Sequence, residues 1–284
     1  MRYDNLEIEE KNSVITLTVN RPEKLNALSS KVMMELISFL KSLWKSDRSY
    51  VGLILTGKGE RSFIAGADIK EMSRMNASEG EAFGALGQEV TTLLESLPIP
   101  VVACVNGFAF GGGCEMALAS DIIYAVESAQ FAQPEVNLGL IPGFGGCVRL
   151  FRRIGPGRAK ELIYSGRKIS AAEAERIGLA DRVFPTKEAM LLEAKNFLIE
   201  VAQKSSFAIS ICKSVINQAD GLDIEAGLLA EKRGFRCAFS HEHMRIGTDS
   251  FLEKRTAQFS SIPVSGLKSQ SPKSSTPVTR KLVI

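Results

Sequence analysis

The chain has 284 residues, of which 45% are hydrophobic and 24% charged, so it can bury a large core in one or two domains. Its 35 basic and 32 acidic side chains leave a net charge of +3, which is too small to predict a nucleic-acid partner. The N-terminal residues contain no apolar signal core, and no uninterrupted apolar run is long enough for a membrane span. We therefore expect neither a signal peptide nor a membrane helix.

The cysteines and histidines predict neither disulfides nor a metal site. The five cysteines form no CxxC pair and lie mostly in apolar sequence, which favours a reducing compartment, most simply the cytoplasm. His241 and His243 are two residues apart and would point in different directions on a helix, with no further histidine to complete a site. No GxGxxG motif follows a predicted strand, so we expect no dinucleotide cofactor either.

The first hundred residues alternate strand and helix patterns. Leu6 to Glu10 and Val14 to Val19 alternate apolar and polar residues, as the two arms of a hairpin do. Ser29 to Lys45 predicts an amphipathic helix capped by a serine, and Val51 to Thr56 predicts a strand. Asn76 to Leu97 predicts another helix, weakened by its glycines.

A glycine turn near the middle of the chain is the first candidate site. Val101 to Val105 is a β-branched run typical of a buried strand, and Gly111, Gly112 and Gly113 precede a run of helix formers that starts at Cys114. Early N–H groups of a helix lack internal partners, so the amide of Gly112 is suited to hold a carbonyl oxygen that turns negative. The glycines can equally serve tight packing alone.

Two glutamates and a second loop of small residues extend this site. Glu115 lies in the first turn of the predicted helix, and Glu135 precedes another apolar run. Two carboxylates that face one substrate can share acid and base catalysis, because burial and mutual repulsion shift their pKa values. Glu135 can also be a helix cap or a surface acid. The loop from Ser62 to Met72 contains Ala67, whose amide is a second candidate oxyanion donor.

Beyond residue 121, the predicted pattern changes from short strands to helices and then to a Ser- and Pro-rich segment. Ile122 to Ala125, Ala129 to Ala132 and Asp181 to Phe184 predict short strands, whereas the pattern from Thr186 to Phe259 is almost wholly helical. Beyond Ser260 the sequence is rich in Ser and Pro and has no acidic residue. We therefore expect residues 261–284 to form a disordered tail.

Four motifs occur in one order between residues 20 and 146: Asn20–Leu28, Ala65–Glu71, Asn106–Glu115 and Gln133–Gly146. Together they resemble the crotonase superfamily, and most of all its enoyl-CoA hydratases. The resemblance implies an α/β fold, with a spiral of ββα units over residues 1–185. It also implies a helical region over residues 186–260 that makes a homotrimer or homohexamer and contacts CoA.

The same resemblance assigns an activity and site residues. It implies a lyase that adds water to trans-2-enoyl-CoA in fatty-acid β-oxidation, with CoA as part of the substrate and no separate cofactor. The hydratase glutamates correspond to Glu115 and Glu135, and the amides of Ala67 and Gly112 would hold the thioester oxygen. The positions expected along the acyl-CoA are Lys24, Ala65, Gly66, Asp68, Ile69, Gly111, Phe251 and Lys254. Many relatives with other activities lack one of the two glutamates, whereas this chain has both.

Two other functions stay open at this point. The first is another crotonase reaction, such as isomerisation of the enoyl-CoA double bond. The second is RNA binding, which some relatives with this fold perform. A clustered basic stripe is expected for that function, but Lys41 to Arg48 carries only three basic residues beside Asp47. We therefore expect no nucleic-acid partner.

Overall fold

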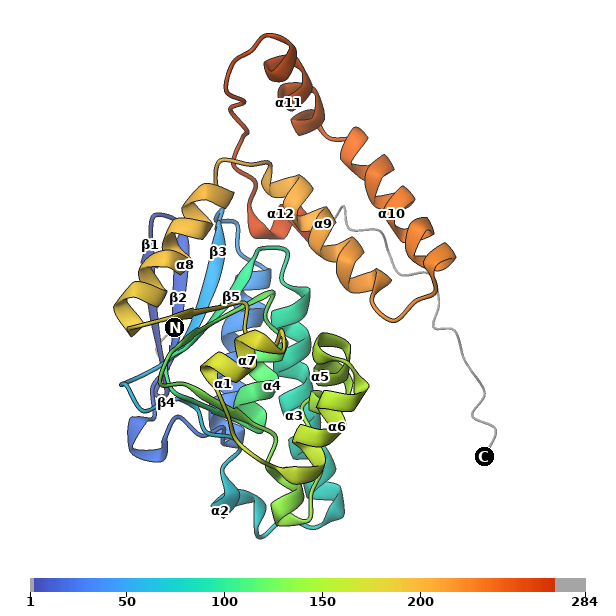
Figure 1. Cartoon of the computed structure of the whole chain (residues 1–284). Helices are drawn as coiled ribbons and strands as arrows, with labels where there is room; N and C mark the ends of the chain where they lie inside the picture. Colours follow the sequence, from blue (N-terminus) through green and yellow to red (C-terminus); the bar gives the residue numbers. More distant parts are fainter. Residues whose placement is uncertain (1–2, 269–284) are drawn as a thin grey trace.

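The computed structural model describes residues 3–268 and contains two sheets wrapped by helices (Figure 1). The larger sheet has the strand order β1 (Leu6–Lys11), β2 (Val14–Val19), β3 (Gly52–Gly57), β5 (Val101–Val105), β7 (Ile122–Val126) and β10 (Arg182–Phe184). The smaller sheet has the order β4 (Ser62–Ile64), β6 (Phe108–Phe110), β8 (Gln130–Ala132) and β9 (Ile169–Ser170). The predicted hairpin is confirmed as the antiparallel pair β1–β2, and the other pairs of the larger sheet are parallel.

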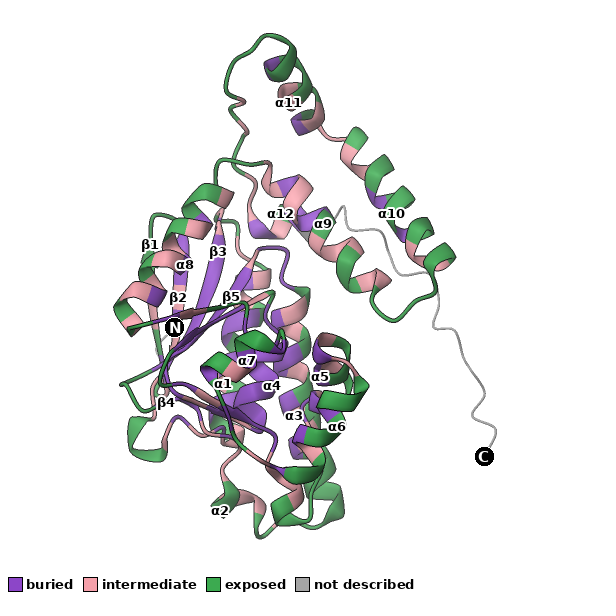
Figure 2. Ribbon diagram, in the orientation of Figure 1, coloured by how far each residue is buried: buried purple, intermediate pink, exposed green. Residues whose placement is uncertain are grey.

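The apolar strands form the centre of the core. Every residue of β3 and β5 is buried, as expected for interior strands of a parallel sheet that is covered on both faces. Figure 2 shows this buried layer in purple, with helices outside it. The β1 strand at the edge of the sheet is largely exposed, which agrees with its many charged residues.

The helices that enclose the two sheets begin largely where the sequence places their caps. Ser29 accepts a hydrogen bond from the Val32 amide at the start of α1, and Asn76 forms a capping box with Glu79 at the start of α3. The helical elements of this region are η1 (Pro22–Lys24), α1 (Ser30–Trp44), α2 (Ile69–Met72), α3 (Ala77–Ser96), α4 (Gly112–Leu118), η2 (Glu135–Leu138), α5 (Gly146–Ile154), α6 (Pro156–Ser165) and α7 (Ala171–Arg176).

The predicted helical region beyond Thr186 is confirmed. It consists of α8 (Lys187–Val201), α9 (Ser206–Ala219), α10 (Ile224–Phe239) and α11 (Glu242–Leu252). Helices α10 and α11 stand away from the sheets (Figure 1), and their surface is mostly exposed (Figure 2). The exposed residues of these two helices include large apolar side chains: Leu228, Leu229, Phe235, Phe239, Phe251 and Leu252.

A buried ion pair joins α9 to the larger sheet. Lys213 donates to Asp121 Oδ2 at 2.7 Å and to the Ile99 carbonyl at 3.1 Å, and only 9% of its side chain is exposed. The same Asp121 oxygen accepts from the amide of Val101 at 2.7 Å. The lysine therefore ties α9 to the start of β5 in the larger sheet.

The prediction of a disordered tail is wrong for residues 261–268. Val264–Lys268 forms α12, which packs against α1 and α9, and Val264 and Leu267 are completely buried in the main core. The Val264 amide donates to the Arg48 carbonyl at 3.1 Å. Composition predicted disorder because the segment is rich in Ser and Pro and has no acidic residue, but two apolar side chains three positions apart, Val264 and Leu267, are buried in the contact with α1 and α9. Residues 269–284 lie outside the described part.

Among residues 3–268, no helix is both long enough and apolar enough to cross a membrane.

Candidate active site

Two loops lie together at the carboxyl ends of β4 and β6, which pair in parallel. The first leads into α2 and contains Ala67, and the second is the glycine turn that begins α4. Gly113 packs on the backbone of β4, since a Cβ at this position would come within 1.9 Å of the Ile64 carbonyl oxygen. Only glycine permits this approach, which holds Gly112 beside the first loop.

Leu28 fixes the orientation of the first loop. Its amide donates to the Gly66 carbonyl, and its carbonyl accepts from the Asp68 amide, both at 2.8 Å. Neither the Ala67 amide between these bonds nor the Gly112 amide donates to another group in the described part of the chain. Two backbone N–H groups without an internal acceptor are suited to stabilise a carbonyl oxygen that gains negative charge.

Glu115 is almost completely buried in the first turn of α4. Its Oε1 accepts hydrogen bonds from the amides of Phe144 at 2.7 Å and Gly146 at 2.6 Å. Burial raises the pKa of Glu115 to about 7, although the two amides and the charge of Arg149 lower it. The carboxyl group therefore exchanges its proton near neutral pH, as a general acid or base must.

Glu135 begins η2 and lies against the glycine turn. A Cβ on Gly111, which has φ +48°, would come within 2.6 Å of Glu135 Oε1. The Gln133 amide, assigned with its nitrogen towards Glu135, donates to both carboxylate oxygens at 3.1 Å. Burial, together with the negative charge of Glu115, raises the pKa of Glu135 to about 7. The structure thus brings together the two carboxyl groups that the sequence singled out.

The electrostatics of this pair favour divided roles. Two nearby carboxyl groups with pKa values in one range resist simultaneous ionisation, so near neutral pH one tends to keep a proton while the other is charged. A site in this state holds one base and one acid.

Within residues 3–268, no group of three or more His, Cys, Asp or Glu side chains could hold a metal ion.

Comparisons with known proteins give the family. The family model described as enoyl-CoA hydratase/isomerase matches residues 9–262. The chain belongs to this family. It is 41% identical to a crotonyl-CoA hydratase of Syntrophomonas wolfei, covering 91% of this chain and 99% of that one. It is 43% identical to a short-chain-enoyl-CoA hydratase of Clostridium acetobutylicum, covering 90% and 97%.

A crystal structure from this family confirms the predicted fold. The enoyl-CoA hydratase of Bacillus anthracis superimposes with a TM-score of 0.85 and 35% sequence identity, covering 90% of this chain and 99% of the other. The α/β crotonase fold with a C-terminal helical region is therefore confirmed.

Several positions that the family resemblance assigned to CoA surround the first loop. The Ala65 amide donates to the Leu25 carbonyl at 3.1 Å, and this places Lys24, exposed at the end of η1, beside the loop. Asp68 caps α2 and pairs with Arg21 at 3.1 Å. Ile69, in the first turn of α2, is half exposed, and Gly66 and Gly111 belong to the two loops already described.

Phe251 and Lys254 are not brought to this site within one chain. Phe251 lies on α11 and is 82% exposed, and Lys254 follows the end of that helix. In Figure 1, α11 stands at the opposite end of the molecule from α2. Within one chain, α11 therefore keeps these two residues away from the loop that leads into α2.

Three residues beside the glutamates carried no individual role in the sequence analysis. They are Gln133, Phe144 and Arg149, which contact a glutamate directly or hold the turn that does. The only local signal was the group of glycines at positions 143, 145 and 146, which predicts a tight turn but not what the turn contacts.

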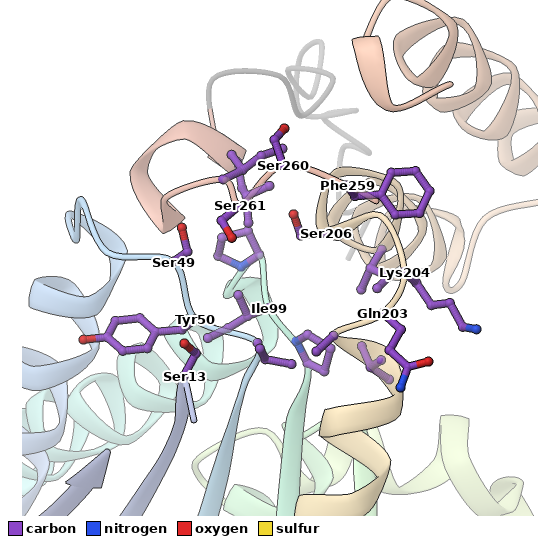
Figure 3. Close-up of a pocket in the computed structure, with 18 of the residues that line it drawn as sticks. Ser13, Ser49, Tyr50, Ile99, Gln203, Lys204, Ser206, Phe259, Ser260 and Ser261 are labelled. Atoms are coloured by element: carbon purple, nitrogen blue, oxygen red, sulfur yellow. The ribbon is translucent and has the colours of Figure 1, made fainter. Parts of the chain in front are cut away.

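A cavity of about 390 Å³ lies elsewhere in the molecule (Figure 3). Its walls come from the residues before β3 and β5, the turn between α8 and α9, and the segment 256–262. These are the amino ends of the strands, whereas open α/β sheets place ligands at the carboxyl ends. None of the family's expected site residues lines this cavity.

Proposed function

We propose that the chain catalyses the reversible addition of water to trans-2-enoyl-CoA esters with short acyl chains. The observation that carries the proposal is the meeting of Glu115 and Glu135 beside the two unpaired amides. The relatives named as crotonyl-CoA and short-chain-enoyl-CoA hydratases support the short acyl chain.

In the proposed mechanism, the thioester oxygen accepts hydrogen bonds from the amides of Ala67 and Gly112. Ionised Glu115 orients a water molecule and removes its proton as the water oxygen adds to C3 of the acyl group. The electron pair of the double bond moves towards the thioester, and the two amides stabilise the enolate oxygen. Protonated Glu135 then delivers a proton to C2. Transfer of one proton from Glu115 to Glu135 restores the starting state.

The helical region supports a proposed assembly. The apolar side chains exposed on α10 and α11 need a covering surface, because contiguous apolar patches are a mark of protein interfaces. We assign them to the interface of a homotrimer, alone or as half of a hexamer. Phe251 and Lys254 would then reach the CoA of a neighbouring subunit, and Lys24 would contact the CoA of its own. The cytoplasmic location and the role in β-oxidation stay predictions.

The proposal is tested by comparing two reactions of the purified protein. Crotonyl-CoA hydration, followed through loss of the conjugated double bond's ultraviolet absorbance, should be fast. Isomerisation of a 3-enoyl-CoA should be slower in kcat/KM. A faster isomerisation would overturn the assignment in favour of the isomerase activity in the family's name. A panel of enoyl-CoA esters with longer acyl chains would show which chain lengths the acyl pocket accepts.

A further inference from the structure

The turn that holds Glu115 is itself held by one face of α3. The Gln88 amide donates to the Gly143 carbonyl at 3.0 Å, and the Thr91 hydroxyl donates to the Phe144 carbonyl at 3.0 Å. The Phe144 ring packs where Gly87 leaves room, since a Cβ there would lie 2.1 Å from the ring. The position of the turn relative to Glu115 therefore depends on α3.

Arg149 links this turn to α3 through a planar guanidinium group. Its Nε and Nη2 donate to the two oxygens of Glu95 at 3.2 and 2.8 Å, and its Nη1 donates to the Phe144 carbonyl and to Thr91 Oγ1, both at 3.2 Å. The guanidinium also fills the space beside Gly145, where a Cβ would come within 2.0 Å of Nη1. Only 16% of the Arg149 side chain is exposed.

We propose that Arg149 is a positioning residue for the hydration reaction, because it fixes the turn so that the Phe144 and Gly146 amides stay on Glu115. This inference rests on the proposed function. Arg149 does not need to touch the substrate. It binds the carbonyl of Phe144, the residue whose amide donates to Glu115, and its bidentate pair with Glu95 supplies a geometry that a lysine cannot reproduce.

The positive charge of Arg149 adds a second effect. Without the arginine, the buried Glu115 carboxylate loses a favourable charge and its amide donors become mobile, so its ionised form becomes less stable. The other ionisable groups that interact electrostatically with Glu115 are Glu135, Cys114 and Cys147, and Glu95 loses its ion-pair partner when Arg149 is replaced by methionine. Burial raises the pKa of both thiols, so they stay neutral near pH 7, and Glu135 is common to every variant compared below.

The test compares Arg149→Met and Arg149→Lys with Arg152→Met. Arg152 lies on the same helix but pairs with Asp220 at the surface, at 3.0 Å, so its variant should keep wild-type kcat. For Arg149→Met we expect kcat for crotonyl-CoA to fall about 100-fold, as for comparable misplacement of catalytic groups, with KM changed less than about threefold. The acid limb of the pH–rate profile of Arg149→Met should move to higher pH, because ionised Glu115 is less stable in this variant. Arg149→Lys keeps the positive charge but loses the bidentate geometry, so kcat should fall about tenfold and the acid limb should move less than in Arg149→Met.

The outcomes separate this inference from the proposed function. A wild-type protein that hydrates no enoyl-CoA defeats the proposed function. An active wild type with wild-type kcat in Arg149→Met, or with a loss confined to KM, overturns the positioning role. If Arg149→Met does not fold, Arg149→Lys decides alone: a wild-type kcat in the folded lysine variant also overturns the proposal.

Discussion

The short helix α12 should stabilise the whole fold, although its sequence predicted a disordered tail. Leu267 is completely buried between α1 and α9, and Leu→Ala changes at such positions destabilise a protein by about 2–5 kcal/mol. We therefore expect Leu267→Ala to lower the free energy of unfolding by that amount. Deletion of residues 262–284 also removes Val264, so it should cost more than deletion of residues 269–284, which keeps α12.

Urea unfolding of these variants, at one protomer concentration because assembly contributes to stability, measures the effect. Ser265→Ala is the matched control. It removes an exposed hydrogen bond to Asp47 Oδ1 (2.9 Å) from the same helix, and should change stability by no more than about 0.5 kcal/mol. The packing argument would be refuted if Leu267→Ala lowered the free energy of unfolding no more than Ser265→Ala does. It would also be refuted if the chain ending at Ser261 were as stable as the one ending at Lys268.

Three further predictions concern the site. Glu115→Gln and Glu135→Gln should each lose most hydration while KM changes less than about tenfold, and the losses should not multiply in the double variant; near-normal turnover of either single variant argues against the assignment. Gly112→Pro and Gly112→Ala place the same Cβ 2.9 Å from the Phe144 ring, but only proline removes the N–H, so proline should be about 100-fold slower than alanine in steady-state assays. The pKa values of Glu115 and Glu135 are both raised on folding from 4.5 to about 7, so wild-type stability should fall between pH 4.5 and pH 7 as the two buried carboxyls lose their protons, with about 3 kcal/mol of the fall coming from Glu115. In Glu115→Gln, the free energy of unfolding measured by denaturant titration should fall much less over the same pH range. An equal fall would show that other groups cause the pH dependence.

Local patterns predicted the elements whose stability is local. The runs that became β3 and β5 needed only an apolar β-branched sequence, and the caps Ser29 and Asn76 act within one helical turn. The family motifs located Glu115 and Glu135, but spacing alone could not show that they meet.

The contacts that control the candidate site are non-local and left no comparable signal. Glu115 is held by amides about thirty positions further on, and the partner of Arg149 lies on α3, 54 positions earlier. The burial of Leu267 likewise depends on contacts of α12 with α1 and α9, which the composition of a Ser- and Pro-rich segment cannot predict.

The burial of Lys213 makes this amine a natural reporter on the helical region. An amine-reactive reagent needs access to an uncharged Nζ, but this group is enclosed by Asp121 and the Ile99 carbonyl. Surface lysines such as Lys160 should be modified at once, whereas Lys213 should be modified only during the intervals when α9 lifts from the sheet. The labelling rate of one side chain, read by mass spectrometry, thus measures how often the α9–α11 region separates from the core that carries Glu115.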